Sequence, residues 1–158
     1  MPNFAFAIAF VLDQEGGYVA NDAGRGETNM GINSSANPGV DVKSLTEAQA
    51  TVIYKAQYWD SIALDLLPIR LGVAVFDGAV NSGPRTAVTL LQRAVGVTED
   101  GVLGPVTAAA VRNMPTALRR FMVLRALRYT QHPQFITYGP VWLARLLECH
   151  AFCLGLPE

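Results

Sequence analysis

The chain has few charged residues, and no early apolar run is long enough to cross a membrane. Only 16% of its 158 residues are charged and 51% are hydrophobic, which excludes the composition of a disordered chain. The longest early apolar run covers residues 4–12 and has nine residues, whereas a membrane-spanning helix needs about 20. We therefore expect one domain, residues 1–158, with a sizeable core and no stable insertion into a membrane.

Cysteine and histidine are also scarce. Cys149 and Cys153 lie four residues apart with His150 between them, a spacing that is poor for a disulfide and gives too few ligands for a zinc site. Packing of the thiols in the interior is the favoured role. His132 and His150 are isolated from other ligands, so the sequence implies no metal and no organic cofactor. Reduced thiols fit synthesis in the cytosol.

The net charge of −1 hides an asymmetry between the two halves of the chain. Residues 1–80 contain nine acids and four bases, and residues 81–158 contain four acids and eight bases. A nucleic-acid-binding protein normally has a more basic total, so we expect no nucleic-acid partner. The basic half could lie against an anionic polymer or pair with the acidic half, and internal pairing is slightly favoured.

Proline and glycine divide the chain into segments with helical periodicity, and no segment has convincing strand alternation. This pattern predicts an all-α domain of about seven helices, with a capping box of Ser44 and Glu47 before the second helix. The pattern does not decide whether a minor hairpin forms near Met30 to Val42. The expected helices span residues 4–12, 47–59, 68–81, 84–95, 105–114, 115–132 and 140–155.

An acidic residue followed by two glycines comes directly after the first expected helix. Gly16 and Gly17 can adopt the left-handed conformation that ends a helix. The partial negative charge of the helix end and the apolar surroundings both favour the neutral form of the Glu15 carboxyl. A carboxyl tuned in this way suits a general acid, although a plain helix cap is the open alternative.

The loop after these glycines is rich in small polar groups. It can approach a ligand closely, and its side chains can bind sugar hydroxyls or position a water. An ordinary polar loop is the alternative interpretation. The polar residues are Asn21, Asp22, Glu27, Thr28 and Asn29.

Two further pairs are candidates for ligand contact. Tyr58 and Trp59 end the second expected helix and could stack on sugar rings, although aromatic residues at helical spacing favour the core. Asp77 and Asn81 share one face of an apolar helix and need polar partners or water there. They either cap neighbouring helix ends or face a cleft.

Several motifs resemble the glycoside hydrolase family 108 N-acetylmuramidases, which are lysozyme-like phage endolysins and secretion activators. The resemblance implies a lysozyme-like fold, with residues 1–83 as the catalytic segment and residues 84–158 as a peptidoglycan-binding segment packed on it. The matches occur in family order over most of the chain, and they read E-G-G-Y-V, G-E-T-N-M-G-I, N-P-G-V-D-V-K-S-L-T-E-A-Q-A, I-Y-K-A-Q-Y-W-D, F-D-G-A-V-N-S-G and L-Q-R-A-V-G-V-T-E-D-G-V-L-G-P-V-T.

The resemblance implies that Glu15 is the general acid that cleaves β-1,4 bonds between N-acetylmuramic acid and N-acetylglucosamine. The family's usual second acid is missing or displaced, so Asp22 is the nearest substitute as base, and Thr28 would orient the attacking water. The family motif around Asn81 suggests that it binds an acetamido group or a hydroxyl. The expected substrate contacts are Tyr18, Asn29, Tyr58, Trp59, Asp77 and Asn81.

Other functions stay open at this point. Glu15 acting alone would resemble a lytic transglycosylase, and loss of activity through displacement of the second acid would leave a peptidoglycan-binding module. A secretion accessory that opens the wall locally is a further alternative. Hydrolysis by a phage-type endolysin is favoured. No Lys or Arg precedes the first apolar run, so the secretory signal pattern is missing. We expect synthesis in the cytoplasm and action on the periplasmic cell wall after release by a holin or a secretion system.

Overall fold

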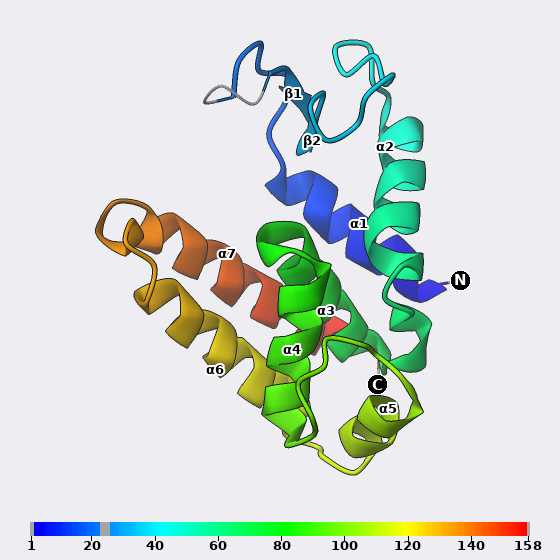
Figure 1. Ribbon diagram of the computed structural model, residues 1–158, viewed down its shortest axis with the longest axis vertical. Coiled ribbons are helices and arrows are strands. Elements are labelled where there is room, and N and C mark those ends of the chain that lie inside the picture. The colour runs from blue at the N-terminus through cyan, green and yellow to red at the C-terminus, as the bar shows by residue number, and fades with distance from the viewer. Residues whose placement is uncertain (1, 23–25, 158) are drawn as a thin grey trace.

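Seven α-helices make up most of residues 2–22 and 26–157, the part of the chain that the computed structural model describes (Figure 1). Two short strands, β1 (Thr28–Asn29) and β2 (Ile32–Asn33), form a small antiparallel hairpin. The predicted mainly α domain is confirmed. The helices are α1 (Pro2–Gln14), α2 (Glu47–Tyr54), α3 (Ile69–Ser82), α4 (Pro84–Val95), α5 (Pro105–Arg112), α6 (Ala117–Thr130) and α7 (Phe135–Gly155).

Helix α3 lies at the centre of the molecule, between α1 on one side and α6 and α7 on the other (Figure 1). Residues 71–79 of this helix are all buried, as expected for a helix that packs against neighbours on every side. The rings of Phe4, Trp59 and Phe76 meet edge to face, with centroids 5.5–5.8 Å apart. Burial of each side chain of this size contributes roughly 1.5–3 kcal/mol. This cluster joins α1, Trp59 and α3.

Helix α2 begins with a capping box, but at a different pair of residues from the predicted one. Thr46 and Gln49 form it, whereas the hydroxyl of Ser44 donates to Asp41 Oδ2 at 2.7 Å. Ser44 is therefore occupied by a local turn and cannot cap the helix. The helix continues through a π-helical segment, Lys55–Asp60, so its predicted extent to about Trp59 is close to the observed one.

The start of α7 corrects a second prediction. The helix begins at Phe135, and Pro140, which was expected to start it, lies inside. Proline cannot donate to the carbonyl four residues before it, which belongs to Ile136. Pro140 is the sixth residue of the helix, and because Ile136 is 94% exposed, water can satisfy the carbonyl that the proline leaves without a donor.

The Cys149 and Cys153 thiols are free and fully buried within α7. The predicted packing role is confirmed by this burial. A hydrogen bond with Cys153, together with burial, raises the pKa of the Cys149 thiol. Within residues 2–22 and 26–157, none of the helices is long and apolar enough to cross a bilayer.

A hairpin, which the sequence pattern left undecided, is present and folds back towards the end of α1. Its turn consists of Met30 and Gly31, which have φ values of 47° and 73°, the positive values that a two-residue hairpin turn requires. The backbone N–H of Met30 donates to Gly16 O at 3.1 Å, and Val19 pairs with Thr28. The hairpin is thereby tied to the segment that follows α1.

Candidate active site

Glu15 directly follows the last residue of α1, and the turn of the hairpin closes over its carboxyl group. Its backbone N–H donates to Val11 O at 2.9 Å, and its side chain is 18% exposed. A Cβ atom at Gly31 would lie 2.6 Å from Glu15 Oε2 and would also collide with the Tyr54 hydroxyl. Glycine at this turn therefore allows both the positive φ and the close approach to the carboxyl.

A chain of ion pairs connects Glu15 to the centre of the fold. Arg145 Nη1 lies 2.8 Å from Glu15 Oε1, and its Nε donates to Asp77 Oδ1 at 2.9 Å. Asp77 Oδ2 in turn lies 2.7 Å from Arg125 Nη2, and both side chains are at most 2% exposed. Buried charges of this kind are tolerated only when they are paired. The site thus joins α1, α3, α6 and α7.

Both arginines remain charged in this setting. Burial alone would lower the pKa of Arg125, but the neighbouring Asp77, Tyr129 and Cys149 groups raise it above its ordinary value. Burial acts in the same way on Arg145, and the Asp77 and Glu15 carboxylates raise its pKa. The sequence predicted apolar surroundings for Glu15, and the structure adds the Arg145 guanidinium, 2.8 Å from Glu15 Oε1.

Two tyrosines border the Glu15 carboxyl. Burial, followed by the negative charge of Glu15, raises the pKa of both Tyr54 and Tyr58. The Tyr54 hydroxyl donates to Met30 O at 2.9 Å and so holds the hairpin turn in place. The half-buried Tyr58 ring contacts Tyr54, with centroids 5.6 Å apart. Tyr58, which the sequence predicts to contact substrate, therefore lies near Glu15.

The hairpin brings together the two groups expected to act on water. Thr28 Oγ1 donates to Asp22 Oδ2 at 3.4 Å, and the Asp22 backbone N–H donates to Gly26 O at 3.0 Å. Both side chains are partly exposed. Asp22, which precedes β1, and Thr28 of β1 therefore form one polar pair.

Tyr18 and Asn29 also make contacts within this region. The Tyr18 hydroxyl donates to Glu27 Oε1 at 2.5 Å, and this hydrogen bond raises the pKa of Tyr18. Asn29 Nδ2 donates to Val42 O at 3.1 Å and so holds the following loop against the hairpin. The exposed Tyr18 ring remains accessible, and substrate contact by either residue stays a prediction.

The positions of Trp59 and Asp77 correct their assignment as direct substrate contacts. Trp59 is 1% exposed and packs between Phe4 and Phe76, so it belongs to the core. Asp77 is 0% exposed and both its oxygens are bound by arginines. Its role is to hold Arg145 and Arg125, which the sequence did not associate with it.

Asn81 is exposed, and it borders a second polar feature. The Tyr129 hydroxyl donates to Asn81 Oδ1 at 3.0 Å and accepts from Arg125 Nη2 at 3.2 Å. Asp77 and Asn81 are four residues apart on α3, as Arg125 and Tyr129 are on α6. These matched spacings, which place both members of a pair on one helix face, are the signal that could have revealed the network.

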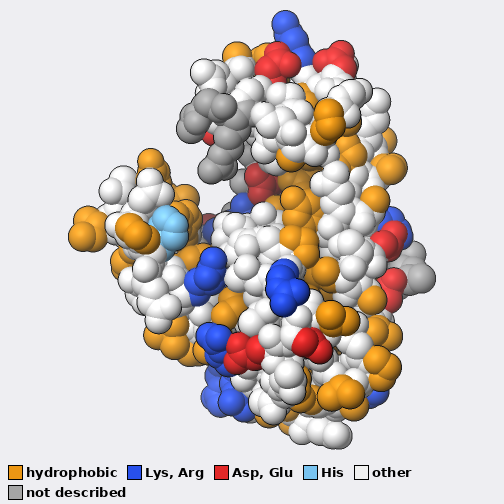
Figure 2. All heavy atoms as spheres, viewed as in Figure 1, with side chains coloured by type: hydrophobic (Ala, Val, Ile, Leu, Met, Phe, Trp, Pro, Cys, Tyr) orange, Lys and Arg blue, Asp and Glu red, His pale blue; other side chains and the backbone are white. Residues whose placement is uncertain are grey.

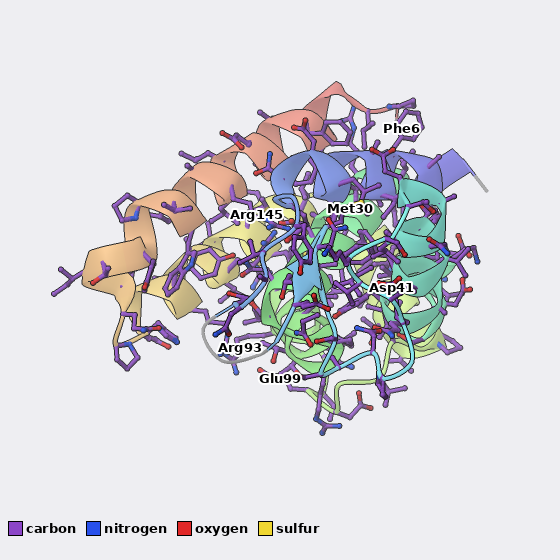
Figure 3. All side chains as sticks on the ribbon, turned by 90° about the horizontal axis from the view of Figure 1, so that it is seen from above. Phe6, Met30, Asp41, Arg93, Glu99 and Arg145 are labelled. Carbon is purple, nitrogen blue, oxygen red and sulfur yellow. The ribbon has the colours of Figure 1, made fainter. Side chains whose placement is uncertain are left out.

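One face of the molecule is hollowed. Figure 2 shows a notch between the part of the molecule that carries the hairpin and the arm formed by the ends of α6 and α7, with acidic and basic side chains at its base. In Figure 3, Arg145 lies beside the end of α1 and close to Met30 of the hairpin turn. The Glu15 and Arg145 side chains are partly exposed, at 18% and 16%.

This mainly helical domain is similar to known proteins in both sequence and structure. Residues 8–83 match the family model described as Glycosyl hydrolase 108. The chain is also similar to the solved structure of Brucella abortus SagA, with 37% sequence identity, a TM-score of 0.86, and coverage of 97% of this chain and 94% of that chain. The chain belongs to the glycosyl hydrolase 108 family.

The comparisons leave the finer assignments as predictions. No curated protein matches the chain in sequence. The family model ends at residue 83, between α3 and α4, and the assignment of residues 84–158 to peptidoglycan binding remains a prediction. Family membership supports a lysozyme-like role on peptidoglycan.

Proposed function

We propose that the protein is an N-acetylmuramidase that hydrolyses the β-1,4 bond between N-acetylmuramic acid and N-acetylglucosamine. The observation that carries this proposal is the partly exposed Glu15 carboxyl, which lies under the hairpin turn and is held by Arg145 at 2.8 Å. Cleavage of a glycosidic bond requires a proton on the leaving oxygen, and in this proposal Glu15 delivers it.

Arg145 positions the carboxyl through one oxygen. It contacts Glu15 Oε1, and Glu15 Oε2 has no hydrogen-bond partner among the described residues. Because Asp77 binds the same guanidinium, the positive charge is shared between two carboxylates. Glu15 Oε2 is thus left free to deliver a proton to the leaving oxygen of a bound glycan strand.

Asp22 is the proposed base, with the Thr28 hydroxyl beside it. A carboxylate and a hydroxyl in contact at 3.4 Å can hold and activate one water molecule between them. A second candidate reaction, closure of an anhydro ring by Glu15 alone, needs no base. The two reactions differ in whether Asp22 is needed.

Asp22→Asn is expected to slow the digestion of purified sacculi by roughly 10²–10⁴-fold, the usual contribution of a general base. The measurement is the release of dye from dye-labelled sacculi. Asp41→Asn is the matched control, since Asp41 is exposed and bound to Ser44 in the next loop. An unchanged rate in Asp22→Asn would assign water activation to another group or favour ring closure.

Gly31→Ala is expected to lower the same rate by at least about tenfold, because a 1 Å displacement of catalytic groups can cost about a hundredfold. Gly39→Ala is a matched control. Both glycines have positive φ, at 73° and 90°, but a Cβ atom at Gly39 would meet no atom within 4 Å. Both variants should lose similar stability from the backbone, about 1–2 kcal/mol. Equal activity in the two would show that the turn does not position Glu15.

We further propose that the protein acts on the cell wall after release by a holin or a secretion system, as expected for an endolysin.

The chain should release soluble fragments from purified sacculi without any added metal. A binding module would sediment with the sacculi and release no fragments, and this outcome would exclude the proposed activity.

A further inference from the structure

A pocket of about 310 Å³ opens beside Asn81, where the end of α3 meets α6 and α7. Its walls include three rings in contact: Trp142 lies 5.7 Å from Tyr129 and 5.1 Å from His132, between ring centroids. Arg128 forms another part of the wall. Aromatic rings with one cation suit a ligand that has both apolar and anionic parts.

Arg128 also lines a neighbouring pocket of about 280 Å³, together with Arg85 and Arg93. Neither pocket is lined by an acidic residue. Arg93 is bound to Glu99 by two contacts of 2.9 and 2.7 Å, but the Arg128 side chain has no hydrogen bond or ion pair within residues 2–22 and 26–157. Figure 2 shows basic side chains on the face below the notch, next to a histidine at the arm.

These pockets start close to the proposed general acid. Asn81 lies one helical turn, about 6 Å along the axis, from Asp77. A single guanidinium, that of Arg145, connects Asp77 to Glu15. A short chain attached to the sugar at the cleavage site can therefore reach Arg128.

We propose that the two pockets bind the peptide stem of peptidoglycan and that Arg128 binds a carboxylate of that stem. This inference rests on the proposed function. The lactyl carboxyl of muramic acid is consumed in the amide bond to the stem, so the free carboxylates of the polymer belong to the peptide. A guanidinium binds a carboxylate through two parallel hydrogen bonds, and one without a protein partner is available for this.

The test compares two substrates: glycan strands that carry stems and the same strands after an amidase has removed them. The ratio of kcat/KM on the two strands reports stem recognition. Arg128→Gln is expected to lower this ratio about tenfold, the effect of losing one charge-assisted hydrogen bond. Arg128→Lys should retain part of the ratio because it keeps the charge.

Arg120→Gln is the control, since Arg120 is exposed on the same helix and lines neither pocket. An unchanged ratio in Arg128→Gln, or an equal fall in Arg120→Gln, would overturn the inference while leaving the proposed function intact. A wild-type protein that cleaves neither strand would overturn the proposed function, and the inference with it.

Discussion

Glu15→Gln is expected to lower the rate of dye release from labelled sacculi by about 10²–10⁴-fold or more, because the amide cannot deliver a proton to the leaving oxygen. The fold should survive the change. The amide is nearly isosteric with the carboxyl, and its oxygen can still accept the hydrogen bond from Arg145 that Glu15 Oε1 accepts at 2.8 Å. Circular dichroism and thermal unfolding would verify this.

Glu148→Gln provides the control for removing one acid. Glu148 is exposed on α7 and has no hydrogen bond or ion pair among the described residues, so its variant should retain the wild-type rate. A Glu15→Gln variant that digests sacculi at nearly the wild-type rate would show that another group supplies the proton.

Asp77→Asn is expected to lower the free energy of unfolding by about 3–5 kcal/mol, the usual effect of breaking a buried ion pair. Asp77 is the shared partner of Arg125 and Arg145, and its side chain is 0% exposed. Without its charge, the Arg125 guanidinium, which is 2% exposed, remains buried and uncompensated. Urea denaturation followed by circular dichroism measures the loss.

Asp60→Asn is the matched control for this prediction. Asp60 pairs with Lys55 at 2.7 Å, but the two side chains are 50% and 44% exposed. Exposed pairs contribute about 0–1 kcal/mol because water screens them. If the two variants lost equal stability, the buried network would not be what holds α3, α6 and α7 around the site.

Much of the fold could be predicted from the sequence because proline and glycine mark most helix ends. Pro84 opens α4 and Gly96 ends it with a φ of 75°, as expected for a left-handed cap. Local sequence signals did not identify the cap of α2, because two residues suit that position equally well. Ser44 and Thr46 both suit a helix cap, and only the bond from Ser44 to Asp41 decides between them.

Only part of the candidate site could be predicted, because local sequence patterns do not report distant contacts. Glu15 is marked by the two glycines after it, but its partner Arg145 is 130 residues away, and no local pattern reports a tertiary contact of that range. The opposite charges of the two halves did predict internal pairing, and the Glu15–Arg145 and Asp77–Arg125 pairs confirm it for these residues. Trp59 was misassigned because helical spacing does not separate a core ring from one at a surface.

The most direct test of the central claim is digestion of purified sacculi in ¹⁸O-labelled water, with the products identified by mass spectrometry. If Glu15 protonates the leaving oxygen and water completes the reaction, the fragments will end in reducing N-acetylmuramic acid that carries one ¹⁸O atom. Unlabelled anhydro ends, or labelled N-acetylglucosamine ends, would contradict the proposed hydrolysis.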